Sequence, residues 1–301
     1  MRLTKTELSY LGKKYKKTNP LALFSSIETA LTGDEEKTLE EKEVLKGGNT
    51  TQQNDKLLNT VADPQRCTRL ILKDGSYFIE KYAYRTGEEY ALAENDDGEV
   101  IISPREHLDE ALFQISQWVG MSDLKTFNLE TTLLNDETVV LLAITDIQRE
   151  RVLGSYLGEK GLDEISYIQI REHLENPAQG SLLRILTGNY KFAIPKAEET
   201  KEILDRLISK NIVAFQTGYS LLGDYVDFAS SFLIPKSVIM LETFNLNEQN
   251  EISGAGVLCL WAGMKEIISI VFREGATEIN SISGRQLLQM IEDFLNCPEV
   301  A

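Results

Sequence analysis

Apolar and polar residues follow two different periods along this chain. In "SPREHLDEALFQISQWVG" at 103–120, apolar residues recur every three or four positions, which predicts an amphipathic helix. In "RLILK" at 69–73 and "SYFIEKYAY" at 76–84, short apolar or alternating runs stand between turn-forming residues, which predicts strands. The chain therefore combines helices and strands, and the order of these elements decides the fold class.

Two stretches of the chain open with Asn-Pro and close with Leu-Thr-Gly. They are "NPLALFSSIETALTG" at 19–33 and "NPAQGSLLRILTG" at 176–188. In each, the Asn can cap a helix, the Pro fits the first turn and the final Gly can end it. We therefore expect two short helices with these apolar faces and end residues: Leu23, Phe24, Ile27 and Leu31 with Gly33, and Leu182, Leu183 and Leu186 with Gly188.

The segments around these two stretches also correspond. Before them stand the helical patterns "TKTELSYLG", in which Thr4 and Glu7 have the spacing of a capping box, and "ISYIQIREHLE". After them come charged helical segments at 34–48 and 196–211. Two Leu-Leu segments then align at an offset of 164 residues, with these matched pairs: Leu57 and Leu221, Leu58 and Leu222, Asp63 and Asp227, Leu70 and Ile234.

Each series continues as a strand meander. In the first, Asp74-Gly75, Gly87 and Asp97-Gly98 are turn signals between strand-like segments. In the second, "SVIMLETF", "GAGVLCLW" and "KEIISIVF" are strand-like, with a turn at Gly263 and a longer loop at 245–253. Both meanders lead into a final amphipathic helix, for which the predicted capping boxes are Ser103 with Glu106 and Ser283 with Gln286.

The recurring order predicts an internal repeat in an α+β protein. We expect an N-terminal α+β half at 1–120, a connecting helical segment at 121–162 and a C-terminal α+β half at 163–301. The connecting segment contains a mostly apolar helix from Asp136 to Leu157. A duplicated unit tends to pack about a pseudo-two-fold axis, so the two meanders can join edge to edge in one sheet and protect their strand edges.

Composition narrows the possible functions. The 301 residues carry a net charge of −16, which repels phosphate backbones and argues against a nucleic-acid partner. The three cysteines form no CxxC pair, which suits a reducing cytoplasm. The basic N-terminal stretch lacks the apolar core of a signal peptide, and no apolar run is long enough for a membrane span.

The chain shows no pattern of catalytic or metal-binding chemistry. Its two histidines, His107 and His173, lie in charged helical segments, and we interpret both as surface or capping residues. No Walker A motif and no G-x-G-x-x-G motif is present. We therefore expect no catalytic residues, no metal, no cofactor and no small-molecule substrate.

Three segments carry a family resemblance: "LTKTELSYL", "KEVLKGG…DKLLNTVADPQRCTRLIL" and "NSISGRQLLQMIEDFL". They resemble the EspG-like chaperones of type VII secretion and the EsaE-like proteins encoded beside secreted toxins. The resemblance implies a pseudo-two-fold fold with a central, mostly antiparallel sheet flanked by helical bundles. It also implies a cytosolic, non-enzymatic chaperone or adaptor that holds a helical secreted substrate and presents it to the secretion ATPase.

An apolar patch would carry such binding, and aromatic residues in strands or at helix ends are candidate anchors. The candidates are Tyr82, Tyr84, Trp118 and Trp261, each of which also fits core packing. Two other functions stay open. One is an enzyme with an unrecognised acidic site assembled from dispersed carboxylates. The other is a winged-helix-like regulatory or DNA-binding protein, which the low positive charge of the would-be recognition segments disfavours.

Overall fold

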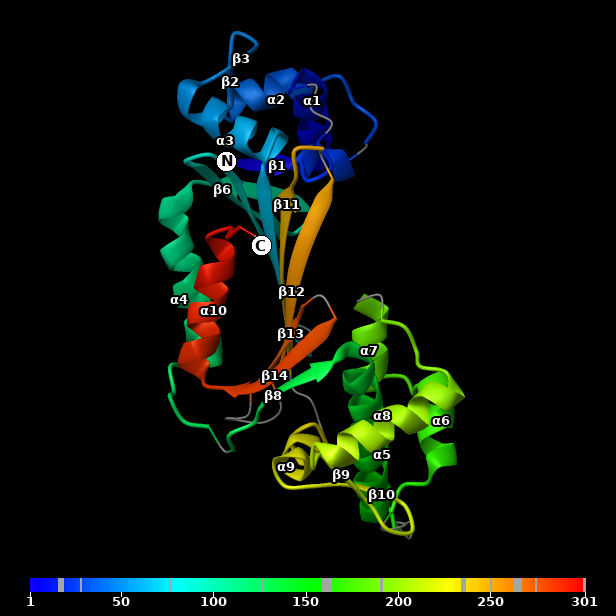
Figure 1. The fold of residues 1–301 in the computed structure, drawn as a ribbon. Coiled ribbons are helices and arrows are strands. Elements are labelled where there is room, and N and C mark those ends of the chain that lie inside the picture. The colour runs from blue at the N-terminus through cyan, green and yellow to red at the C-terminus, as the bar shows by residue number, and fades with distance from the viewer. Residues whose placement is uncertain are drawn as a thin grey trace. The chain divides into compact units, whose positions relative to one another are not determined.

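The chain folds into a mixed arrangement of helices and strands (Figure 1). The computed structural model describes residues 1–15, 19–27, 29–75, 77–125, 127–158, 164–189, 192–233, 237–249, 251–261, 267–273 and 275–299. By contacts, the chain divides into two compact units. Unit 1 comprises Met1–Asp123, Ser237–Leu258 and Gly284–Ala301, and unit 2 comprises Leu124–Lys236 and Cys259–Ser283. The division by sequence into 1–120, 121–162 and 163–301 stays a prediction.

The elements of unit 1 come from three stretches of the chain. They are β1 (Arg2–Thr4), α1 (Lys5–Tyr15), the 3-10 helix η1 (Leu23–Ser26), α2 (Glu35–Glu41), β2 (Leu45–Lys46), β3 (Asn49–Thr50), α3 (Gln52–Ala62), β4 (Arg66–Asp74), β5 (Tyr77–Thr86), β6 (Glu89–Asp96), β7 (Glu99–Ser103), the 3-10 helix η2 (Arg105–His107), α4 (Leu108–Val119), β11 (Ser237–Leu246), most of β12 (Ile252–Trp261) and α10 (Gly284–Leu295).

The elements of unit 2 surround one long helix. They are β8 (Glu130–Leu134), α5 (Asn135–Tyr156), α6 (Tyr167–Glu175), α7 (Leu182–Asn189), α8 (Ala197–Ser209), β9 (Val213–Phe215), β10 (Tyr219–Leu221), α9 (Asp224–Ser231), β13 (Ile267–Phe272), β14 (Ala276–Ile282) and the end of β12. Among the described residues, no helix combines the length and the apolar character that a membrane crossing needs.

Ten strands form the main sheet, in the order β1-β7-β6-β5-β4-β11-β12-β13-β14-β8. All of its pairings for which a register is described are antiparallel. The predicted α+β class with a central, mostly antiparallel sheet is therefore confirmed. The predicted edge-to-edge joint of the two meanders is also present, because β4 pairs with β11 from Arg66↔Asn245 to Asp74↔Ser237.

The same order of elements occurs twice along the chain. The first series is α1, η1, α2, the β2–β3 hairpin, α3, the meander β4–β7 and α4. The second series, in the same order, is α6, α7, α8, the β9–β10 hairpin, α9, the meander β11–β14 and α10. The offset of 164 residues is wrong for the Leu-Leu segments, because it matches Leu57 of α3 with Leu221 of strand β10. A constant offset cannot align the two series, because the second series contains more residues than the first. A duplication in the origin of the chain stays a prediction.

The helix predicted over 19–33 is wrong beyond the short η1. Residues 29–34 are not helical, and Leu31 is 37% exposed. Glu35 provides the reason, because its carboxylate accepts the backbone N–H groups of Thr32 at 2.5 Å and Gly33 at 2.9 Å. These bonds hold the chain in a turn before α2. The charged helix predicted over 34–48 is also too long, since α2 ends at Glu41 and the β2–β3 hairpin follows.

The second Asn-Pro stretch forms its helix later than predicted. Helix α7 begins at Leu182 rather than at Asn176, and Gly188 lies inside the helix instead of ending it. The carboxylate that caps α7 belongs to Asp146 of helix α5, far away in the sequence. The apolar face was predicted correctly, because Leu182, Leu183 and Leu186 are buried. The helix predicted from Asp136 to Leu157 is also present, as α5.

The capping predictions had mixed outcomes. The Thr4–Glu7 capping box is confirmed, because each residue's side chain accepts the other's backbone N–H, at 2.7 and 3.2 Å. The Ser103–Glu106 box is wrong, since Ser103 is the last residue of β7 and a 3-10 turn without a side-chain cap leads into α4. Strand pairing fixes the backbone of Ser103, which pairs with Leu92.

The turns predicted at Gly75, Gly87 and Gly98 are confirmed by positive φ values. The turn predicted at Gly263 lies outside the described residues.

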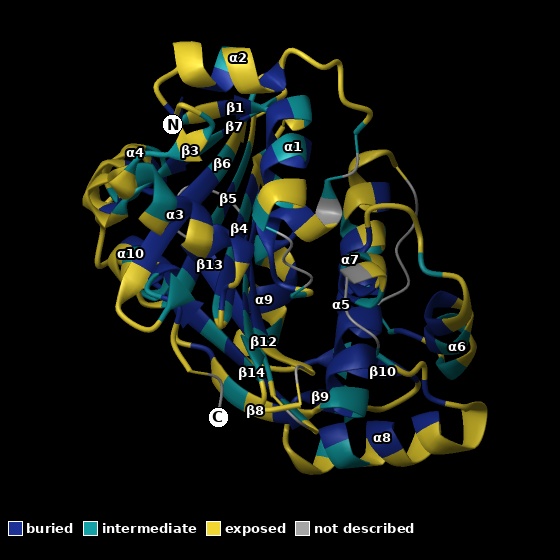
Figure 2. Cartoon of the chain, turned by 90° about the horizontal axis from the view of Figure 1, so that it is seen from above, coloured by how far each residue is buried: buried dark blue, intermediate teal, exposed yellow. Residues whose placement is uncertain are grey.

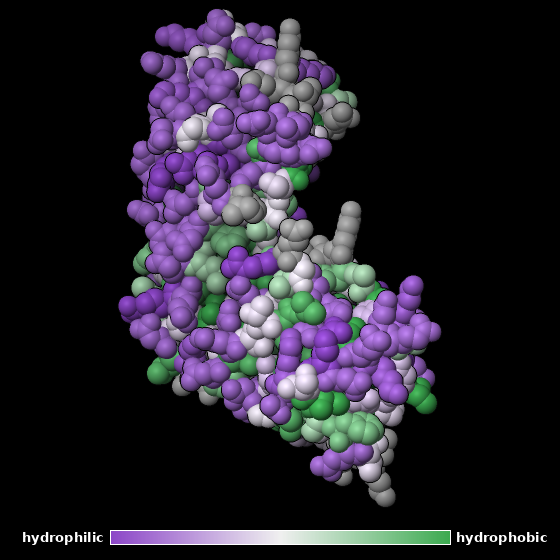
Figure 3. All heavy atoms as spheres, in the orientation of Figure 1, coloured by the Kyte–Doolittle hydropathy of each residue, from purple (hydrophilic) through white to green (hydrophobic). Residues whose placement is uncertain are grey.

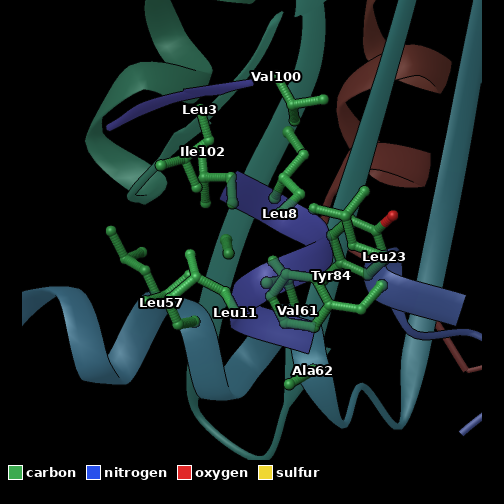
Figure 4. Packing of buried hydrophobic residues seen from close by; sticks show 14 of the residues in the cluster. Leu3, Leu8, Leu11, Leu23, Leu57, Val61, Ala62, Tyr84, Val100 and Ile102 are labelled. Atoms are coloured by element: carbon green, nitrogen blue, oxygen red, sulfur yellow. The ribbon is translucent and has the colours of Figure 1, made fainter. Parts of the chain in front are cut away.

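Helices α1 and α3 close one core in unit 1 (Figure 4). They bring leucines with the spacing of a helical face against Val100, Ile102 and Tyr84 of the sheet. Helices α4 and α10 lie side by side, and α10 also packs against β4 and β11 (Figure 1). In unit 2, α5 is buried over most of its length, as its dark blue ribbon in Figure 2 shows, and α6, α7, α8 and α9 pack around it.

The C-terminal end of α10 is held by donors from the sheet of unit 1. The Tyr90 hydroxyl donates to the Leu295 carbonyl at 3.0 Å, and Arg85 donates to the Asn296 carbonyl at 3.3 Å. Arg66 donates to the Cys297 carbonyl at 3.5 Å. The last carbonyls of a helix lack partners within the helix, so cationic and hydroxyl donors satisfy them and complement the helix dipole.

Replacing Tyr90 with phenylalanine is expected to lower the free energy of unfolding by about 1–2 kcal/mol, because the buried Leu295 carbonyl loses its donor. Urea denaturation monitored by circular dichroism measures the change. The matched control is Tyr77→Phe, since Tyr77 is 51% exposed and its change is expected to stay within about 0.5 kcal/mol of wild type. Equal stability of the two variants would contradict the capping role.

Acid is expected to remove the contribution of Glu35 to stability. Hydrogen bonds, first from the Thr32 backbone and then from the Thr32 hydroxyl and the Gly33 backbone, hold the pKa of Glu35 at about 2, below its ordinary value of 4.5. The folded pKa is depressed, so the contribution is complete above pH 4.5 and is lost as the pH falls through about 2. Glu35→Gln should therefore be less stable than wild type near neutral pH, and the difference should shrink across this window. Urea unfolding at a series of pH values tests this, and a difference independent of pH would contradict it.

Candidate functional site

Unit 2 carries an open groove with a volume of about 800 Å³. Its walls are the start of α6, one face of α8 and the β9–β10 hairpin. The lining residues are Ser166, Tyr167, Ala197, Glu198, Lys201, Glu202, Asp205, Phe215, Thr217, Gly218 and Tyr219. Figure 3 shows hydrophobic side chains on the visible face in the region where Figure 1 places α8 and β9. Three aromatic side chains and four charged ones therefore share this groove.

The hairpin that forms the floor is fixed by backbone hydrogen bonds. Ile165 and Tyr219 exchange two N–H···O=C bonds, both of 2.8 Å, so the hairpin is tied to the residues just before α6. Gly218 permits this approach, because a Cβ there would lie 2.8 Å from the Cβ of Glu164 and 2.9 Å from the carbonyl oxygen of Ile165. Ser166 then caps α6 through the Gln169 backbone at 3.2 Å.

The aromatic residues of the floor come from neighbouring positions. Phe215 and Tyr219 are register partners in the β9–β10 pair, and their ring centroids are 4.9 Å apart. Tyr219 is buried, whereas Phe215 leaves 55% of its surface exposed. Tyr167 is fixed at one side, because its hydroxyl donates to the Ala197 carbonyl at 2.6 Å. Phe215 therefore presents an exposed aromatic surface to the groove beside the buried Tyr219.

Helix α8 presents its polar face to the groove and its apolar face to the core. Ile203, Leu204 and Leu207 are buried, while the lining residues of α8 are exposed. Two ion pairs anchor its far end to the start of α5: Arg206 Nε lies 3.0 Å and Lys210 Nζ 2.6 Å from the carboxylate of Glu137. The wall of the groove is therefore attached firmly to the helical core of unit 2.

The rim of the groove has unbalanced negative charge. Glu198, Glu202 and Asp205 stand with one cation, Lys201, on the exposed face of α8. Within the described residues, none of these four side chains takes part in an ion pair. Burial first, and then the nearby charge of Asp205, raise the pKa of Tyr219. The groove thus combines apolar aromatic surface with carboxylates that lack a counter-charge.

The four aromatic residues proposed from the sequence lie elsewhere. Tyr84 is 3% exposed and belongs to the core of unit 1. Tyr82 is half-buried, stacks on Tyr84 with centroids 6.2 Å apart and donates its hydroxyl to Glu80 at 2.8 Å. Trp118 is also half-buried, and its Nε1 donates to Asp74 at 3.1 Å. The side chain of Trp261 lies outside the described residues. Among the side chains that the structure describes, Tyr82 and Tyr84 lie together, and partner binding by the four residues stays a prediction.

Sequence reasoning missed Tyr167, Phe215 and Tyr219. The signal for the last two is the segment "AFQTGYS", where aromatic residues flank a Thr-Gly turn in a short alternating run. The alignment of Leu221 and Leu222 with Leu57 and Leu58 instead assigns this part of the chain to a Leu-Leu segment, so it does not predict a hairpin there. Tyr167 follows a Ser that caps a helix, which by itself does not indicate a binding surface.

One prediction about the histidines is wrong. His107 is exposed and pairs with Glu110 three residues later, as predicted for a surface residue. His173 is instead buried, at 7% exposure, with Nε2 3.4 Å from the Asp146 carboxylate. Helix α6 packs on α5 and turns this position inward, where the buried carboxylate attracts hydrogen-bond donors.

The described residues contain no group of three or more His, Cys, Asp or Glu side chains suited to a metal ion. All three cysteines are buried. Burial raises the pKa of the Cys259 thiol to about 12, and burial above all raises that of Cys297 to about 11. Thiols of this kind are protonated and behave as small apolar residues.

Comparisons with known proteins bear on the fold. No protein-family model matches the chain, and no curated protein matches it. A solved structure of the Mycobacterium tuberculosis type VII secretion system chaperone EspG5, in complex with the PE25–PPE41 dimer, is similar to the chain with a TM-score of 0.58. The match covers 100% of this chain and 97% of the EspG5 chain at 8% sequence identity. At this identity the likeness establishes that the two chains share a fold.

Proposed function

We propose that the chain is a non-enzymatic chaperone or adaptor that binds a helical secreted protein and presents it to a type VII secretion system. The observation that carries this proposal is the match of the whole chain to the fold of EspG5, a chaperone in complex with a protein dimer. The resemblance of three sequence segments to the same family supports it independently.

The open aromatic groove of unit 2 agrees with a protein partner. Protein-binding grooves use exposed aromatic residues to cover the apolar stripe of a partner helix. Such a chaperone would act in the cytoplasm, before export, and would also meet the secretion ATPase when it delivers its substrate. Its net charge of −16 would keep the loaded and unloaded forms soluble.

Affinity isolation of the tagged chain from its host of origin, read by mass spectrometry, tests the proposal. We expect a stoichiometric complex with a secreted protein that has a long helical N-terminal region, together with weaker recovery of the secretion ATPase. The complex should be reconstituted from the two purified proteins and elute as one species in size-exclusion chromatography.

The same preparation tests the alternatives. A DNA-binding regulator would bind duplex DNA at low salt, where electrostatic attraction is strongest, and we expect no binding there. Failure to reconstitute any complex with a secreted protein, together with retention of DNA, would overturn the proposed function and leave the fold assignment intact.

A further inference from the structure

We propose that the groove of unit 2 binds one amphipathic helix whose apolar stripe is flanked by lysine or arginine residues. This inference rests on the proposed function and specifies the chemistry of the partner segment. Three properties of the groove support it: an exposed apolar floor, a rigid open shape and a rim with unpaired negative charge.

The floor provides a reason to bind apolar surface. Phe215 keeps 55% of its surface exposed although its register partner Tyr219 is buried beside it. Covering an exposed phenylalanine with an apolar side chain removes apolar area from water on both partners. Tyr167 extends this surface toward α8, and its hydroxyl is already bound to the Ala197 carbonyl. Contact with the face of the Tyr167 ring would therefore leave its hydroxyl bonded.

The shape of the groove suits a helix. One wall is α8, which spans Ala197–Ser209, so a partner helix can lie along it over several turns. The floor is already ordered, because the Ile165–Tyr219 bonds and the close approach at Gly218 fix the hairpin. A pre-formed surface loses little conformational freedom when it binds, which favours affinity.

The rim determines the charge of the partner. Glu198 and Glu202 are four residues apart on α8 and therefore neighbours, and Asp205 lies one turn further on. Like charges at this spacing repel each other, and the single Lys201 does not balance them. Lysine or arginine residues beside the apolar stripe of a partner would supply the missing counter-charges, whereas acidic residues there would add repulsion.

Two synthetic peptides of about 20 residues test this chemistry. Both carry the same leucine stripe at helical spacing, one flanked by lysine and the other by glutamate. Fluorescence anisotropy at low salt measures their affinity for the full chain. We expect the Lys-flanked peptide to bind at least about tenfold more tightly, and its advantage to fall as salt screens the rim charges.

Matched variants locate the binding site. Phe215→Ala is expected to weaken the Lys-flanked peptide at least about tenfold, while Phe78→Ala, at 56% exposure in unit 1, leaves its affinity unchanged. The double change Glu198→Lys with Glu202→Lys should abolish the preference between the peptides. Its control, Glu88→Lys with Glu106→Lys, makes the same change in net charge at exposed positions of unit 1 and should preserve that preference.

Specific outcomes overturn the inference. These are equal affinity for the two peptides, binding of neither peptide, or unchanged affinity in Phe215→Ala. A dimer of the chain that Phe215→Ala dissociates, without peptide binding, would assign the groove to a second copy instead. Reconstitution with the secreted partner separates the two proposals. If Phe215→Ala still forms that complex, the groove is not the site and the proposed function stands. If the peptides bind as expected but no secreted partner is found, the proposed function fails and the groove chemistry stands.

Discussion

Replacing Asp146 with alanine is expected to lower the free energy of unfolding by about 3–5 kcal/mol. Asp146 is 1% exposed in the middle of α5, and its carboxylate joins three parts of unit 2. It accepts the backbone N–H groups of Leu182 at 2.8 Å and Leu183 at 3.0 Å, which begin α7. It also pairs with Arg149 at 2.7 Å and lies 3.4 Å from Nε2 of His173.

The size of this effect follows from what the substitution leaves behind. Arg149 is itself 9% exposed, and its Nε has no hydrogen-bond partner among the described residues. Without Asp146, a buried guanidinium loses its counter-charge and two buried N–H groups lose their acceptor, and such uncompensated groups are costly. The double variant Asp146→Ala with Arg149→Met should therefore recover part of the stability that the single variant loses.

Chemical denaturation followed by circular dichroism measures these differences. The matched control is Asp227→Ala, because Asp227 is exposed in the first turn of α9, where a carboxylate contributes at most about 1 kcal/mol through the helix dipole. If Asp146→Ala were as stable as this control, the network would not hold α7 against α5. If the double variant were less stable than Asp146→Ala, the unpaired guanidinium would not be the main cost.

The sequence pattern predicted correctly those elements whose hydrogen bonds join residues that are close in sequence. The turns at Gly75, Gly87 and Gly98 follow from residues adjacent in sequence, and the Thr4–Glu7 capping box needs only one turn of chain. The long helix α5 is predicted by the long, mostly apolar segment from Asp136 to Leu157. The predictions are wrong where a hydrogen-bond partner that is distant in sequence, or that competes with the helix, determines where a helix begins or ends. Asp146 sets the start of α7, and Glu35 takes backbone groups that a helix over 19–33 would need.

The candidate groove was invisible in the sequence for the same reason. Its aromatic residues come from the start of α6 and from a hairpin after α8, and contacts between distant segments, such as the Ile165–Tyr219 bonds, bring them together. Aromatic residues chosen from strand and helix patterns belong mainly to packed surfaces, as the burial of Tyr84 shows. Exposure depends on what the rest of the chain covers, so Phe215 could not be told from Tyr84 before the fold was known.

Replacing Leu70 or Leu241 with alanine is expected to lower the free energy of unfolding by about 2–5 kcal/mol for each change. The two residues are fully buried register partners at the centre of the β4–β11 joint, where the two meanders meet. Helix α10 packs on both strands, so the space that a lost side chain leaves is enclosed and cannot fill by a small shift of one element.

The pair also tests whether this joint behaves as one packed unit. Directly opposed residues share neighbours, so the double variant should depart from additivity by about 0.5–3 kcal/mol in urea denaturation. The control is Ile252→Ala, a strand residue at 50% exposure, which should lose at most about 1 kcal/mol and add independently to either leucine variant. Strict additivity of Leu70→Ala and Leu241→Ala would mean that the two meanders contribute to stability separately. A measured coupling would mean that the edge-to-edge joint predicted from the repeated order of elements is an energetic link between them.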